Sequence, residues 1–102
     1  MVAPPPLRRS KREILLCEAV AAASVTWARR CMVDVRAQGR TVAGGWPGTR
    51  SEARRLVGQQ AALVGSRPSH AALEQLVADA YSRARDTWLA CAARQREPAE
   101  PE

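Results

Sequence analysis

Residues 10–38 lie in the longest stretch of this sequence without glycine or proline, and apolar or small residues recur there in alternating steps of three and four. With 3.6 residues per turn, this spacing places them on one side of an α-helix. Ser10 begins the stretch with the S-x-x-E pattern of a capping box, and Gly39 follows as a typical residue after a helix end. The pattern predicts a helix over residues 10–38. Its buried stripe is expected to comprise Ile14, Cys17, Val20, Ala21, Ser24, Trp27, Ala28, Cys31, Met32 and Val35.

Two further helices are predicted downstream. Thr49 opens a second capping box, and the apolar spacing that follows runs to Gly65, which indicates a helix over residues 49–64. Ser69 caps a third helix over residues 69–95. The expected buried positions are Ala53, Leu56, Val57, Gln60, Leu63 and Val64 in the second helix, and Leu73, Leu76, Val77, Ala80, Ala84, Trp88 and Cys91 in the third. No alternating run typical of a strand occurs.

The predicted fold is therefore an all-α, three-helix bundle with two long helices, one shorter helix and disordered termini. A single helical domain is expected over residues 10–96, with a Pro/Arg-rich tail over 1–9 and a Pro/Glu tail over 97–102. The filling of this bundle is sparse: Leu, Ile, Val and Phe number 18 of 102 residues, against 20 alanines. A short chain with so few large apolar side chains is expected to be of marginal stability by itself.

The sequence contains no pattern typical of an enzyme or of a metal or cofactor site. The single histidine, His70, has no ligand partner at metal-binding spacing, and no two cysteines lie two to four residues apart. Three cysteines without a regular framework favour a reducing, intracellular environment, in the cytoplasm or in the nucleoid or nucleus, and import into an organelle stays open. A weaker hypothesis is a redox pair of Cys31 and Cys91. The sequence has no uninterrupted run of eighteen apolar residues, so no membrane-spanning helix is predicted.

Net charge suggests one class of partner. The chain has 16 basic and 10 acidic residues, a formal charge of +6, and almost all the basic residues are arginine. Nucleic acid is the natural partner of such a surface, but the arginines are spread along the chain and not gathered in one stripe. Nucleic-acid binding is therefore the alternative hypothesis, and its expected contacts are Arg8, Arg9, Lys11, Arg12, Arg54 and Arg55.

The favoured hypothesis is a small non-enzymatic interaction protein, an adaptor or a subunit that binds another protein or a second copy of itself as a homodimer. Several apolar residues fall outside the buried stripes, and a partner surface would cover them. The expected interface residues are Leu15, Val25, Val33, Trp46 and Leu89, with Arg29 and Arg36 as a polar edge. Trp46 has two interpretations that the sequence leaves open, because a tryptophan in a glycine-rich loop serves equally as an interface anchor or as a plug in the core.

Overall fold

The computed structural model describes residues 10–96, which fold into three α-helices. These are α1 (Lys11–Ala37), α2 (Arg50–Val64) and α3 (His70–Arg96). The predicted all-α bundle with two long helices and one shorter helix is confirmed, and every helix boundary lies within one residue of its predicted place. The predicted tails, 1–9 and 97–102, lie outside the described residues.

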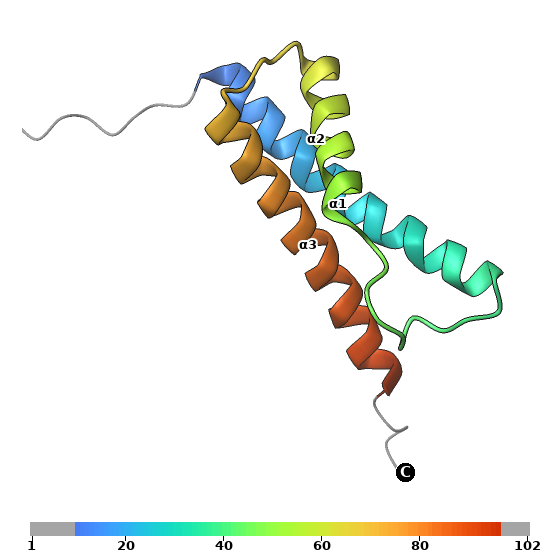
Figure 1. The fold of residues 1–102 in the computed structure, drawn as a ribbon. Coiled ribbons are helices and arrows are strands. Elements are labelled where there is room, and N and C mark those ends of the chain that lie inside the picture. Colours follow the sequence, from blue (N-terminus) through green and yellow to red (C-terminus); the bar gives the residue numbers. More distant parts are fainter. Residues whose placement is uncertain (1–9, 97–102) are drawn as a thin grey trace, which may run out of the picture.

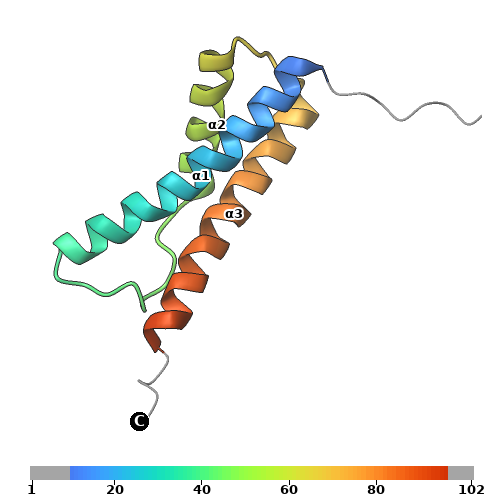
Figure 2. The ribbon, with the colours of Figure 1, turned by 180° about the vertical axis from the view of Figure 1, so that it is seen from behind.

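The two long helices run in the same direction, and α2 runs back between their starts and their midpoints (Figures 1 and 2). The most extensive helix–helix contact is between α1 and α3. Both views show the long helices diverging toward the end opposite to α2, where the loop of residues 38–49 passes between them. Because α2 is short, this loop provides the third layer at that end.

Local capping interactions explain where the helices begin and end. Gly39 has φ +75°, a conformation that favours glycine, and lets the N–H of Arg40 donate to the carbonyl of Val35 at 3.0 Å. At the start of α2 the predicted capping box is complete: the Glu52 N–H donates to Thr49 Oγ1, and the Thr49 N–H donates to Glu52 Oε1. These contacts provide hydrogen-bond partners for backbone N–H and C=O groups that have none within the helix at its ends.

The buried side chains form two clusters along the bundle. The three-helix core lies where all helices meet, and comprises Leu16, Val20, Ala53, Val57, Ala61, Leu76, Val77 and Ala80. The loop core lies between the diverging ends of α1 and α3, and comprises Ala28, Met32, Val35, Val42, Ala84, Trp88 and Ala92. Alanine occurs repeatedly in both cores, so the helices approach closely around a thin filling.

The buried stripes differ from the predicted ones at several positions. On α1, Leu16 is 2% exposed whereas Ile14 is 45% exposed, the reverse of the prediction. On α2, Ala61 is buried and Leu63 is 78% exposed. Two further core residues were not predicted at all: Val42 of the loop and Ala92 near the end of α3. On α1 the difference has a physical reason. In the first half of the helix α2 covers one side, and in the second half α3 and the loop cover another side. The buried side chains therefore wind around the helix axis along its length.

A paired arginine and glutamate connect α2 to α3. Both nitrogens at the tip of Arg54 donate to the Glu74 carboxylate, with Nη2 to Oε2 at 3.1 Å. This hydrogen bonding lowers the pKa of Glu74 below its usual value of 4.5. Because the folded-state pKa is lowered, the pair adds stability above the unfolded pKa and loses it as pH falls through the folded value.

Replacing Glu74→Gln is therefore expected to reduce stability at neutral pH, and the difference from the wild type should disappear in acid below the folded pKa of Glu74. Urea midpoints measured at neutral pH and in acid well below the usual pKa of a glutamate test this. Asp86→Asn is the control. It removes a carboxylate that lies 3.8 Å from Nε of the adjacent Arg85, and both side chains are exposed, so both midpoints should stay unchanged. A Glu74→Gln deficit of equal size at both pH values would contradict the assignment.

Candidate functional site

The outward face of α1 carries apolar residues that no other helix covers. Leu15 is 52% exposed and Val33 is 63% exposed, and they lie about five full turns apart, so they point the same way. Ala22 and Thr26 lie between them within about 20° of the same direction; both are exposed, and Thr26 also borders the groove between α1 and α2. These four residues, Leu15, Ala22, Thr26 and Val33, are called the outer α1 strip.

The polar atom of this strip is satisfied within the helix. Thr26 Oγ1 donates to the carbonyl of Ala22 at 3.2 Å, so the hydroxyl already has an intrahelical acceptor. The strip therefore offers a surface of methyl and methylene groups about 27 Å long. Its opposite side, with Val20, Ser24 and Ala28, is already buried in the bundle. α1 is thus amphipathic in an unusual sense, with a packed small-residue face and a second apolar face in solvent.

Charged residues follow one edge of the outer α1 strip. The exposed charged residues within about 60° of the strip on this edge are Lys11, Glu18, Arg29 and Arg36, and Arg12 and Arg30 are exposed at a similar angle on the opposite edge. Arg29 and Arg36, the predicted polar edge, lie about one turn before and one turn after Val33 on α1. Glu18 adds a negative charge to the same edge. The edge therefore carries charge of both signs next to an apolar centre.

The other predicted interface residues lie elsewhere. Val25 is half-buried and points about 80° away from the strip on α1. Leu89 is 45% exposed on α3. Trp46 lies in the loop between α1 and α2 and is packed against other aromatic rings. The predicted set therefore divides, and Leu15 and Val33 remain as one surface with the two arginines. Leu63 of α2, 78% exposed, is a further apolar residue that the prediction assigned to the core.

All four aromatic residues of the chain meet around Trp46. Its ring centroid lies 5.1 Å from that of Trp27, 5.7 Å from that of Trp88 and 6.5 Å from that of Tyr81, each with edge-to-face geometry. Trp88 Nε1 donates to the Gly44 carbonyl at 3.0 Å, which holds the loop against α3. Trp46 is therefore the centre of an aromatic cluster that fills the gap between the diverging long helices.

Of the residues expected to contact nucleic acid, the four that lie within residues 10–96 do not form one patch. Arg8 and Arg9 lie outside the described residues. Arg12 donates to the Gly65 carbonyl at 3.3 Å, near the end of α2. Arg54 and Arg55 lie about 15 Å from Gly65, toward the start of α2. There Arg54 pairs with Glu74 of α3, and Arg55 borders the groove between α1 and α2. The two α2 arginines thus face opposite neighbours, and Lys11 is separated from both.

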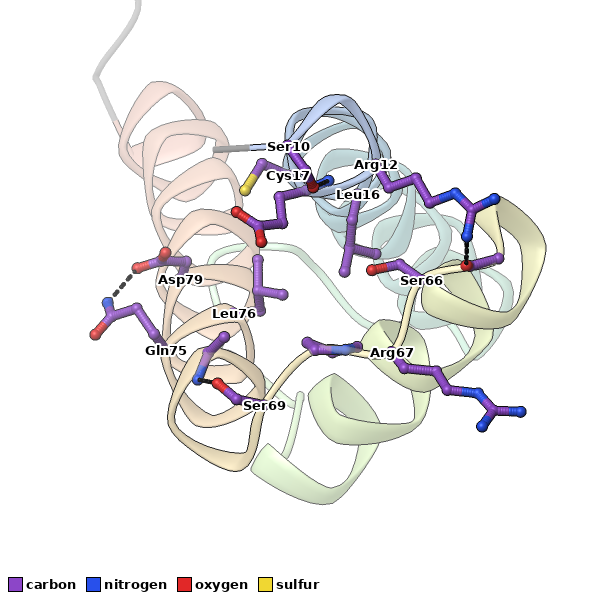
Figure 3. Close-up of a pocket in the computed structure, with 14 residues that line it drawn as sticks. Ser10, Arg12, Leu16, Cys17, Ser66, Arg67, Ser69, Gln75, Leu76 and Asp79 are labelled. Atoms are coloured by element: carbon purple, nitrogen blue, oxygen red, sulfur yellow. Dashed lines mark hydrogen bonds between the residues drawn. The ribbon is translucent and has the colours of Figure 1, made fainter. Parts of the chain in front are cut away.

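A hollow of about 560 Å³ opens at the end of the bundle where α1 and α3 begin (Figure 3). Leu16 and Leu76 point toward one another across it. Its rim mixes basic Arg12 and Arg67 with acidic Glu13 and Asp79. Asp79 accepts from Gln75 Nε2 at 3.0 Å on the outside of α3, and Arg12 is held by Gly65. The rim therefore shows no convergent charge that would select one ligand.

Cys31, one member of the hypothetical redox pair, is a poor nucleophile in this structure. Cys31 and Cys91 both border the loop core, and neither forms a disulfide. Burial raises the pKa of Cys31, and nearby Glu52 and Asp34 raise it further, which keeps this thiol protonated and poorly nucleophilic at neutral pH. Within residues 10–96, no group of three or more His, Cys, Asp or Glu side chains is arranged to hold a metal ion.

Similarity to known proteins gives no further guide to the function of this chain. Comparison with protein-family models, with curated proteins and with solved structures finds no match to this chain. Across the described part of the chain, no helix has the length and apolar character needed to cross a lipid bilayer. The outer α1 strip with its charged edge is therefore the candidate functional surface, and it rests on geometry alone.

Proposed function

We propose that this chain is a small, non-enzymatic interaction protein that binds another protein through the outer α1 strip. One observation carries the proposal: Leu15 and Val33 are more than half exposed on the same line of a helix whose other face is already packed. Leaving such a line in water has a cost of roughly 25 cal/mol for each Å² of apolar surface. A partner that covers it regains that free energy and stabilises a sparsely filled bundle.

The chemistry of the strip supports a helical or flat protein partner. Alanine and threonine in the middle allow another backbone to approach closely, and the larger Leu15 and Val33 fill the two ends. Polar residues border the apolar centre, which is the usual arrangement of a protein interface. A reducing interior fits the thiols of Cys31 and Cys91, and we place the proposed interaction inside the cell.

Site-specific photocrosslinking in the native cell tests this function. A photoreactive amino acid replaces Ala22 in the strip, and the control carries it at Ala90, which is exposed on α3. Ala22 is expected to crosslink to protein, and Ala90 is not. Absence of a protein adduct specific to Ala22 would overturn the proposed function. Adducts from Ala22 to nucleic acid in place of protein would favour the alternative instead.

A further inference from the structure

The outer α1 strip has the same spacing when it is read from either end. Its residues stand at 15, 22, 26 and 33, so reversing the helix about residue 24 exchanges Leu15 with Val33 and Ala22 with Thr26. A two-fold axis at that point would bring Leu15 of one chain opposite Val33 of another, and Ala22 opposite Thr26. Self-complementarity of this kind is what a symmetric homodimer interface requires.

One pair of charges on the edge of the strip, Glu18 and Arg29, fits the same symmetry. Reversal about residue 24 brings Glu18 level with position 30 of the other copy, about 1.5 Å along the axis from Arg29. A two-fold axis normal to the plane of the two helices leaves the charged edges of both copies on the same side of that plane. Glu18 of each copy therefore faces Arg29 of the other. Within one chain these two residues are about 16 Å apart along α1 and form no ion pair in the described residues.

From this double match we infer that the protein binds a second copy of itself by antiparallel pairing of two α1 helices across the outer strip. The inference rests on the proposed function and names its partner. Small residues at the centre let the two backbones pack closely, while Leu15 of each copy contacts Val33 of the other. The interface is about 27 Å long and one helix wide, which places it among the small, reversible interfaces.

Salt is expected to have little effect on this pairing. The same reversal brings Lys11 level with position 37 of the second copy, about 1.5 Å along the axis from Arg36, so like charges repel at each end of the seam. Two attractive pairs near the centre and two repulsive pairs at the ends oppose one another, so screening weakens both. Self-association that depends on protein concentration and hardly on ionic strength is the expected result in sedimentation experiments.

Charge reversal gives the decisive test. Glu18→Arg alone and Arg29→Glu alone each turn two attractions into two repulsions, and each is expected to weaken self-association about tenfold or more. Mixing the two variants should restore association, because each copy then carries the charges that complement the other. The double variant E18R/R29E should also self-associate. Matched controls on α3, Asp86→Arg and Arg83→Glu, change the charge equally and should have no effect, alone or mixed.

Sedimentation velocity and native mass spectrometry measure these outcomes, and circular dichroism confirms that each exposed substitution leaves the fold intact. A chain that stays monomeric at all concentrations would overturn self-pairing, while a crosslink from Ala22 to a different protein would leave the proposed function standing. Wild-type association without rescue in the mixture would overturn the antiparallel arrangement. A heterodimer formed only when the two single variants are mixed supports it directly.

Discussion

Trp46→Ala is expected to reduce the free energy of unfolding by about 3 kcal/mol or more, a large part of the stability of a domain this small. The indole is the hub of the aromatic cluster, and its removal breaks three edge-to-face contacts at once. It also opens a cavity between α1, α3 and the loop, where few large side chains are available to fill it. Urea unfolding followed by far-UV circular dichroism measures the loss.

Trp46→Phe provides the matched comparison. It keeps a ring at the hub and removes Nε1–H, which is buried without a hydrogen-bond partner in residues 10–96, so it should lose less than half as much. A Trp46→Ala variant as stable as the wild type would show that the loop does not act as a plug.

The same cluster can be tested from the backbone side. A Cβ at Gly48 would lie 2.1 Å from Trp46 Cζ2 and 2.8 Å from Trp27 Cζ2, so Gly48→Ala forces the rings apart and is expected to cost about 1–3 kcal/mol. Gly45→Ala, three residues earlier, meets nothing within 4 Å and should change stability by less than about 0.5 kcal/mol. Equal effects of the two variants would contradict the close approach of Gly48 to the indole rings.

Leu16→Ala is expected to have the second largest effect, a loss of about 3 kcal/mol. Leu16 is 2% exposed in the three-helix core, and the residues around it include Ala53, Ala61 and Ala80, which are too short to fill the cavity left behind. The thermal or urea midpoint should fall without a change of helix content in the native state.

Ile14→Ala is the control for that experiment, because it removes a side chain of similar size that is 45% exposed on the same helix. It should cost less than about 1 kcal/mol. Comparing the two variants tells which residue is buried: Leu16, as in the structure, or Ile14, as in the sequence prediction. A larger loss for Ile14→Ala than for Leu16→Ala would restore the predicted orientation of α1.

The helices could be predicted because their determinants are local. Ser10, Thr49, Gly39 and Gly65 act within one turn of the backbone, and the three–four spacing requires nothing beyond the helix itself. The common direction of Leu15 and Val33 is local as well, since it follows from the helical period. The aromatic cluster could not be predicted, because Trp27, Trp46, Tyr81 and Trp88 come from distant parts of the chain.

The sequence by itself determined the number of helices, their limits and the existence of a second apolar line on α1, because each depends on interactions between residues a few positions apart. Only the tertiary structure decided which arc of each helix is buried and where Trp46 lies. Those outcomes depend on how far the short α2 reaches along α1 and on the divergence of α1 and α3, which together create the gap that the loop fills. Long-range packing of this kind has no signature in local spacing.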